Sequence, residues 1–199
     1  DAPKDASKTP KPRPYAHAPR LPEGEPIDPR SLVKGAWLEL EVGPGRGGFM
    51  FERAAAVPEA GIIGLEIRRK WATIVDERLA KAGLGSRARV FAEDAKDALG
   101  RMGPAGILER AFLHFPDPWW KKRHHKRRIM NARFLKDVSR KLQMNGKLHF
   151  WTDVEEYYKL SLELIAGEIP WLHGPLVVDE QPPEHEWDYR THFERRTRL

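Results

Sequence analysis

The feature of the sequence that most constrains the fold is a glycine-rich segment at 43–48 (GPGRGG), which follows a short apolar run. Residues 36–42 of that run alternate so that Leu38, Leu40 and Val42 share one face, as in a β-strand. A helical pattern at 47–57 overlaps the last glycines. Glycines between a strand and a helix permit a tight turn and let the backbone approach a ligand closely. The segment therefore predicts the first strand, loop and helix of an α/β domain.

The same alternation of strand and helix patterns continues along the chain to residue 168. Further strands are predicted at 61–67, 88–91, 110–115 and 147–151, and further helices at 70–82, 95–102, 131–142 and 154–168. Short strands that alternate with helices are typical of a mostly parallel sheet with helices on both faces. In such sheets, ligands bind beyond the carboxyl ends of the strands. We therefore expect the functional residues at those ends.

Composition bounds the domain organisation and the class of protein. Eight of the 17 prolines lie in residues 1–30, so we expect a flexible, basic, proline-rich tail there and a single domain at 31–199. The chain has no cysteine, which excludes disulfides, thiolate zinc sites and cysteine nucleophiles. No apolar run is long enough to span a bilayer and no signal peptide is visible, so we expect a cytoplasmic protein, as a monomer or homodimer. The net charge of +6 indicates an anionic partner.

Three acidic residues, Glu41, Glu66 and Asp94, lie at or just after the predicted ends of the first three strands. The glycines at 43, 45 and 48 formally match the G-x-G-x-x-G loop of dinucleotide-binding enzymes. However, the Glu41 carboxylate would repel a pyrophosphate, whereas it suits the ammonium group of S-adenosylmethionine. Glu66 can accept both hydroxyls of a ribose, and Asp94 can lie beside an adenine. The pattern favours a methyl donor over a dinucleotide, and the alternative is a tight turn with two surface acids.

A second distinctive segment, 115–128 (FPDPWWKKRHHKRR), directly follows the fourth predicted strand. Two prolines flank Asp117 and hold the chain extended at the rim of the sheet. Trp119 and Trp120 either stack on an exposed base or pack within the protein. The basic residues after them favour docking of a nucleic-acid backbone, with a solvated surface or a targeting tract as the alternative. His124 and His125 have no matching ligand cluster, so we predict no metal site.

These segments resemble the bacterial tRNA (guanine-N7-)-methyltransferases over roughly residues 37–194. The glycine loop is shared by many methyltransferases, whereas the FPDPW segment followed by the basic run is far more specific to this family. Thr152-Asp153 after the fifth strand and THFE at 191–194 also match, in the same order. The resemblance implies a Rossmann-like class I fold and S-adenosylmethionine as the cofactor. It also implies methyl transfer to N7 of the variable-loop guanosine at position 46 of tRNA.

The same resemblance implies roles for individual residues. The donor would be bound by Glu41, Gly43, Gly45, Glu66 and Asp94, and the key catalytic residue would be Asp117. Contacts to the tRNA would come from Lys121, Asp153, Thr191, His192, Phe193 and Glu194. Members of the family usually continue into a last strand after THFE, whereas this sequence ends at Leu199. We therefore expect the final strand to be missing and place the penultimate strand at 175–179.

The chemistry expected at Asp117 follows from the target atom. Guanine N7 carries a lone pair and no proton, so it needs no general base, and the base becomes cationic as it accepts the methyl group. A carboxylate beside the base stabilises that charge, and we assign this role to Asp117, with Asp153 and Glu194 holding the base. The alternatives are a methyltransferase for another RNA or for protein, and a tRNA-binding module without catalysis.

Overall fold

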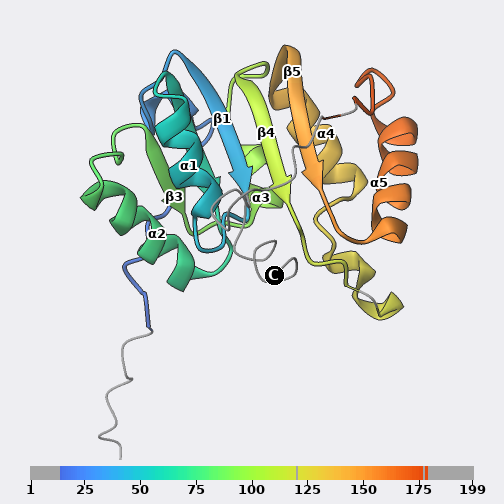
Figure 1. The fold of residues 1–199 in the computed structure, drawn as a ribbon, viewed down its shortest axis with the longest axis horizontal. Helices are drawn as coiled ribbons and strands as arrows, with labels where there is room; N and C mark the ends of the chain where they lie inside the picture. The colour runs from blue at the N-terminus through green and yellow to red at the C-terminus, as the bar shows by residue number, and fades with distance from the viewer. Residues whose placement is uncertain (1–13, 120, 177, 179–199) are drawn as a thin grey trace, which may run out of the picture.

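The computed structural model describes residues 14–119, 121–176 and 178. The described strands are β1 (Trp37–Val42), β2 (Ala60–Leu65), β3 (Ala88–Phe91), β4 (Leu108–His114) and β5 (Leu142–Trp151). The α-helices between and after them are α1 (Gly48–Ala56), α2 (Arg69–Lys81), α3 (Ala95–Arg101), α4 (Ala132–Lys141) and α5 (Glu155–Glu168). Two 3-10 helices are η1 (Pro29–Ser31) and η2 (Lys122–Arg127). Strands and helices thus alternate along the chain, as Figure 1 shows.

The described strands form one parallel sheet with the order β3-β2-β1-β4-β5. In its centre, Leu40 of β1 pairs with Ile63 of β2 on one side and with Ala111 of β4 on the other. The chain moves outward from β1 to β3 and then crosses back to β4, so the strand order reverses between β1 and β4. That reversal is where α/β sheets bind their ligands.

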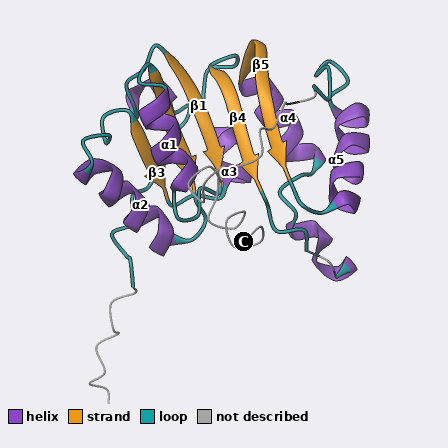
Figure 2. Ribbon diagram, viewed as in Figure 1, coloured by secondary structure: helices purple, strands orange, loops and turns teal. Residues whose placement is uncertain are grey.

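Helices cover both faces of the sheet (Figure 2). One apolar cluster joins the sheet to α1 and α2 through residues such as Met50 and Val75. A second cluster joins it to α3, α4 and α5 through residues such as Leu99, Phe134 and Tyr157. The predicted fold class, a mostly parallel α/β sheet with helices on both faces, is confirmed.

The predicted elements agree with the observed ones within a few residues, except at the start of β5. This strand begins at Leu142, earlier than the predicted residue 147. Leu142 pairs with Leu108, but the next pair joins Lys147 to Arg110, and Asn145 between them has a φ of 64°. The intervening residues form an irregular bulge, and bulged residues do not follow the two-residue alternation by which strands are recognised.

The segment 14–30 packs against the domain, which corrects the predicted extent of the tail. Leu21 and Ile27 are buried in the cluster on the face of α3, α4 and α5. Ile27 donates a backbone hydrogen bond to Arg101 and accepts one from Gly103, each at 2.9 Å. A high proline content indicates the absence of regular structure, but a few apolar side chains are enough to anchor such a segment. The remainder of the predicted tail, 1–13, lies outside the described residues.

The predicted end of the sheet is only partly covered by the structure. Within the strand candidate at 175–179, Pro175, Leu176 and Val178 are not in a strand, and the other two residues lie outside the described part. The expectation of a missing final strand also concerns residues outside the described part of the chain.

The face of β1 toward α1 carries two buried acids, Glu39 and Glu41. Arg53 of α1 donates two hydrogen bonds to the Glu39 carboxylate, Nε to Oε2 at 2.7 Å and Nη2 to Oε1 at 2.6 Å. Nε of Arg110 on β4 lies 3.8 Å from the same carboxylate. A buried carboxylate is tolerated only when opposite charge and hydrogen bonds compensate it. Arg53 provides both to Glu39, and this ion pair holds α1 against β1.

Beside these acids, β4 and β5 carry aromatic and imidazole rings. His149 of β5 stacks on Phe112 of β4, with ring centroids 4.7 Å apart. Phe49 of α1 contacts both Phe112 and His114, at centroid distances of 4.7 Å and 4.5 Å. Burial, together with the positive charge of nearby groups such as Arg110, lowers the pKa of His149 to about 4. The imidazole is therefore neutral in the folded protein at physiological pH.

The glycine loop packs directly against α2 at one position. Gly47 has a φ of +80°, and a Cβ there would lie 2.4 Å from Cγ1 of Val75. Gly83 has a similar φ of +75°, but no heavy atom lies within 4 Å of its Cβ position. Both glycines have a φ in the left-handed region, but only at Gly47 does a neighbouring side chain occupy the space that a Cβ would need.

Alanine substitutions at these glycines separate backbone strain from close packing. Gly47→Ala and Gly83→Ala should each lose about 1–2 kcal/mol because a Cβ disfavours the left-handed region. Only Gly47→Ala should lose a further 1–3 kcal/mol or so from overpacking against Val75. Urea denaturation measures both losses. Equal destabilisation of the two variants would show that the loop does not contact α2 as described.

Substitution of His149 tests the link between its burial and stability at acidic pH. The unfolded chain binds a proton at this histidine near pH 6.5, whereas the folded protein does so only near pH 4, so the unfolded state binds more protons in between. Stability from this residue is therefore lost as the pH falls through that window. His149→Phe keeps a ring against Phe112, and its free energy of unfolding should fall less steeply than that of the wild type.

The control for this experiment is His173→Phe, because His173 is exposed. Its stability should follow the wild-type dependence on pH in urea denaturation series. A wild-type slope in the His149→Phe variant would contradict the assignment of a neutral, half-buried imidazole.

Candidate active site

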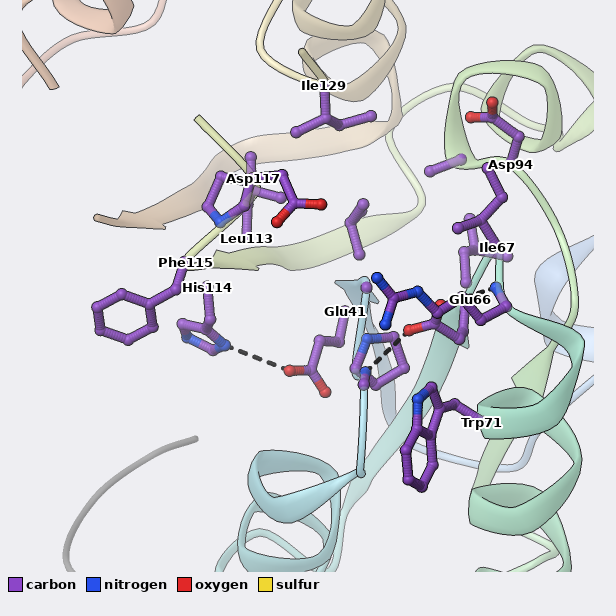
Figure 3. Close-up of a pocket in the computed structure, with 18 of the residues that line it drawn as sticks. Glu41, Glu66, Ile67, Trp71, Asp94, Leu113, His114, Phe115, Asp117 and Ile129 are labelled. Carbon is purple, nitrogen blue, oxygen red and sulfur yellow. Dashed lines mark hydrogen bonds and ion pairs between the residues drawn. The ribbon is translucent and has the colours of Figure 1, made fainter. Parts of the chain in front are cut away.

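A cavity of about 770 Å³ lies at the carboxyl ends of the strands, beside the reversal of strand order between β1 and β4. Figure 3 shows Glu41 and His114 on one side of it and Glu66, Trp71 and Asp94 on the other. The predicted site residues that line the cavity are Glu41, Gly43, Gly45, Glu66, Asp94 and Asp117. The fold therefore brings together, in one cavity, residues from the ends of four different strands.

Glu41 is a buried carboxylate with one unused oxygen. It is 2% exposed, and its Oε1 lies 3.3 Å from Nδ1 of His114, the last residue of β4. Its Oε2 has no hydrogen-bond partner among the described residues. Burial raises the pKa of the Glu41 carboxyl, the contact with His114 opposes that shift, and the nearby Glu66 carboxylate adds to it. Because an unpaired buried carboxylate oxygen is costly, this atom is suited to a positively charged ligand group.

Glu66 orders the glycine loop. Its Oε2 accepts a hydrogen bond from the backbone N–H of Gly45 at 3.0 Å, and its Oε1 accepts one from the backbone N–H of Arg68 at 2.8 Å. Gly43 and Gly45 have φ values of +73° and +54°, in the region that glycine adopts readily. Apart from chain neighbours, no heavy atom lies closer than 4.0 Å to either Cβ position. A ligand in the cavity can therefore approach the backbone of the loop.

The wall near Glu66 also contains two apolar residues that the sequence analysis did not assign to the site. Ile67 is 67% exposed and lines the cavity. Trp71 of α2 lies under the guanidinium of Arg46, whose Cζ is 5.1 Å from the ring centroid. In the sequence, Trp71 belongs to the apolar stripe of its helix, and no pattern distinguishes a residue at the rim of a cavity from one in the core. Together these side chains form a surface that suits a flat ring.

Asp94 completes that wall at the start of α3. It is the N-cap of the helix, and its Oδ1 accepts a hydrogen bond from the backbone N–H of Lys96 at 3.0 Å. Its Oδ2 lies 3.7 Å from the Lys96 ammonium. Capping therefore fixes the orientation of this carboxylate at the cavity.

Asp117 lies in a loop after β4 that is fixed on both sides. The backbone N–H of Phe115 donates to the carbonyl of Trp151 at 2.8 Å, which extends the pairing of β4 with β5. Nε of Arg128 donates to the carbonyl of Pro118 at 2.7 Å. Asp117 itself is exposed and lines the cavity, so its carboxylate is held at the rim rather than buried.

Side chains of the basic run pack on aromatic rings, face solvent, or do both. The Arg127 guanidinium lies 5.0 Å from the ring centroid of Trp119, and His124 contacts the same ring edge-on. Trp119 thus contacts neighbouring side chains, and it also lines the cavity. Arg128 is half-buried and lies over the Tyr157 ring, 5.0 Å from its centroid. The members whose side chains are exposed are Lys121, Arg123, Lys126 and Arg127.

Some predicted site residues do not line the cavity, whereas His114 does and was not predicted. Lys121 and Asp153 are exposed and are not among the lining residues. His114 was missed because it directly follows the apolar residues 111–113 of a predicted strand and belongs to no recognisable motif. Outside the described residues lie Trp120, Thr191, His192, Phe193 and Glu194.

Two features are absent from the described part of the chain. No group of three or more histidine, aspartate or glutamate side chains there could hold a metal ion. None of its helices has the length and apolar character needed to cross a membrane.

Comparison with known proteins identifies the family. Residues 36–198 match a family described as "Putative methyltransferase". The tRNA (guanine-N(7)-)-methyltransferase of Rhodopirellula baltica is 42% identical over 81% of this chain and 61% of its own length. The protein of the same name from Alcanivorax borkumensis is 38% identical over 85% of this chain and 71% of its own length. The one from Alkalilimnicola ehrlichii is 36% identical over 89% and 74%.

Among solved structures, the tRNA (m1A58) methyltransferase of Aquifex aeolicus is 24% identical, with a TM-score of 0.49 over 67% of this chain and 47% of that one. The assignment rests on the sequence matches, in which the chain spans from 61% to 74% of the length of the three relatives named above. The chain belongs to the tRNA (guanine-N7-)-methyltransferase family.

Proposed function

We propose that this chain is an S-adenosylmethionine-dependent methyltransferase that acts on N7 of a guanosine in tRNA. The observation that carries the proposal is a buried Glu41 oxygen without a described partner, in a cavity that also has the Asp117 carboxylate at its rim. The first acid suits the ammonium of the methyl donor, and the second suits a base that becomes positively charged. The name shared by the relatives supports the same reaction.

The residues of the cavity fit the methyl donor. When bound, S-adenosylmethionine supplies an electrophilic methyl group on a sulfonium sulfur. Glu41 Oε2 would accept a charge-assisted hydrogen bond from the donor's ammonium, beside the open backbone of Gly43 and Gly45. Each oxygen of Glu66 accepts one backbone hydrogen bond and retains a second lone pair for a ribose hydroxyl. Asp94 would lie beside the adenine, on the same wall.

Asp117 is the residue that we assign to the reaction itself. Because N7 has no proton to lose, the protein's tasks are to orient the guanine and to balance the charge that forms on it. Asp117 would accept hydrogen bonds from the Watson–Crick edge of the guanine and stabilise its positive charge. The backbone hydrogen bonds of Phe115 and Pro118 hold the loop in place beforehand, so little reorganisation is needed.

Further residues are proposed to contact the tRNA. Exposed cations of the basic run, Lys121 among them, would bind backbone phosphates. Asp153 would help to hold the target base. The remaining proposed contacts come from Thr191, His192, Phe193 and Glu194. The guanosine that we propose as target is the one at position 46 in the variable loop, and the proposed location is the cytoplasm.

Nucleoside analysis tests this function. After incubation with labelled S-adenosylmethionine and bulk tRNA, the wild type should place the label in 7-methylguanosine. Asp117→Ala should lower product formation by about 10–150-fold or more, because a charge-assisted contact to the base is lost. Its affinity for S-adenosylhomocysteine, measured by calorimetry, should remain that of the wild type, because the donor residues are unchanged.

The matched control is Glu163→Ala, which removes an exposed acid of α5 and should leave methylation unchanged. Label in another nucleoside would contradict the assignment of N7. Retained tRNA binding without donor binding would identify a tRNA-binding module instead. Near-normal methylation by Asp117→Ala would remove that residue from the mechanism.

The salt dependence of tRNA binding tests the role of the basic run. Each phosphate contact adds about one unit to the slope of log Kd against log salt concentration. Lys126→Ala should therefore reduce that slope by about one unit and weaken binding similarly for different tRNAs. Lys159→Ala, which removes an exposed cation of α5, should keep the wild-type slope. A loss of slope in both variants alike would mean that binding reflects the net charge rather than this surface.

A further inference from the structure

We propose that His114 is a positioning residue that shares a proton with Glu41, and that binding of the methyl donor at Glu41 expels this proton to solvent. The inference rests on the proposed function, because the ligand is the ammonium-bearing donor. It adds a residue that the sequence analysis did not identify and a dependence of donor affinity on pH.

The side chains of His114 and Glu41 are in direct contact and are shielded from solvent. His114 Nδ1 lies 3.3 Å from Glu41 Oε1, and each side chain is only 3% exposed. The remaining surroundings of the imidazole include the ring of Phe49, edge-on at 4.5 Å, and that of Phe112 at 5.8 Å. The imidazole is therefore confined between aromatic rings with its Nδ1 toward the carboxylate. His114 and Glu41 also line the cavity.

The charges around the pair favour one retained proton. With one proton, the pair is either an ion pair or two neutral groups, and its net charge is zero in both cases. Without that proton the pair carries a buried negative charge, which is costly because both side chains are removed from water. Burial and the Glu66 carboxylate both raise the pKa of Glu41, in agreement with this cost. The proton is a property of the pair rather than of either residue.

No charged group in the described part of the chain donates a hydrogen bond to Glu41 Oε2. From α1, Arg53 is engaged by Glu39, and Arg110 of β4 also lies against Glu39. From β5, His149 is neutral, with a pKa lowered to about 4, in part by His114. The groups that face the pair across the cavity include the acids Glu66, Asp94 and Asp117 and the cations Arg46, Arg68 and Lys96.

A cationic ligand changes this balance at one atom. An ammonium at Glu41 Oε2 supplies, next to this carboxylate, the positive charge that the shared proton had supplied, so the pair can lose its proton. The ammonium and the proton thus compete for the same carboxylate. Linkage then requires the affinity for the ligand to rise with pH as long as the free pair is protonated. The slope cannot exceed tenfold per pH unit, because one proton is released.

Calorimetry with S-adenosylhomocysteine tests the coupling without methyl transfer, because this ligand carries the ammonium and no transferable methyl group. Titrations at each pH from about 5.5 to 7.5 are made in two buffers with different ionisation enthalpies, and the difference gives the number of protons released. The wild type should release up to one proton per ligand, and its Kd should tighten by up to about tenfold per pH unit. At higher pH both effects should fade.

His114→Asn keeps a polar side chain and removes the second site for the proton. Because a proton shared by two sites is held more tightly than by one, proton release in this variant should shift to lower pH. His173→Asn, at an exposed position, should keep the wild-type profile. If His114→Asn does not fold, the proton count of the wild type decides the question. His114→Gln, which also keeps a polar side chain and removes the second site for the proton, provides a second variant with the same expected shift.

The outcomes separate the coupling from the proposed function. Binding of the ligand without proton release, or with a release midpoint unchanged by both His114 variants, would overturn the coupling and leave the donor site intact. Absence of ligand binding at every pH would overturn the proposed donor site, and the coupling with it. Proton release that shifts in the His114 variants and not in His173→Asn would establish it.

Discussion

The arrangement of the site depends on how β1 accommodates two carboxylates on one buried face. Glu39 and Glu41 both point toward α1, and each must be compensated because the sheet excludes water around them. Glu39 receives two hydrogen bonds from Arg53, which also fixes the first helix against the first strand. Glu41 has His114 on one oxygen and no partner among the described residues on the other. The charge of Glu39, in the middle of β1, is thus compensated. The charge of Glu41, near the end of β1 and beside the cavity, is compensated only in part.

Strand order explains why this incomplete compensation occurs at a cavity and not in the core. Between β1 and β4 the order of strands reverses, so the segments that follow them separate and leave room for a ligand. On one side of that space, backbone amides of Gly45 and Arg68 hold the Glu66 carboxylate. On the other, the pairing of Phe115 with Trp151 extends the sheet as far as the Asp117 loop. Backbone hydrogen bonds therefore hold the Glu66 carboxylate and the loop that carries Asp117 before any ligand arrives.

The basic run shows that a cluster of like charges in the sequence can serve two physical purposes. Arg128 binds the Pro118 carbonyl and covers Tyr157, and Arg127 covers Trp119. These guanidinium groups stabilise the loop that carries Asp117, because a planar cation can stack on a ring and donate to a carbonyl. Lysines such as Lys126 are exposed and remain available for an anionic partner. A loss of function in an arginine variant would thus reflect loop structure as well as phosphate binding.

The amino-acid sequence alone predicts the order of strands and helices, the parallel α/β class, the glycine loop and the acids at the strand ends. These features are local, because periodicity and glycine content act over a few residues. The sequence does not predict the bulge at the start of β5, the backbone pairing of Ile27 with residues that follow α3, or the contact of His114 with Glu41. Each depends on a partner distant in the chain: Leu108 for β5, Met102 and Gly103 for Ile27, Glu41 for His114. Only the tertiary structure brought these partners within reach, since burial and hydrogen bonding are decided by neighbours in space and not by neighbours in sequence.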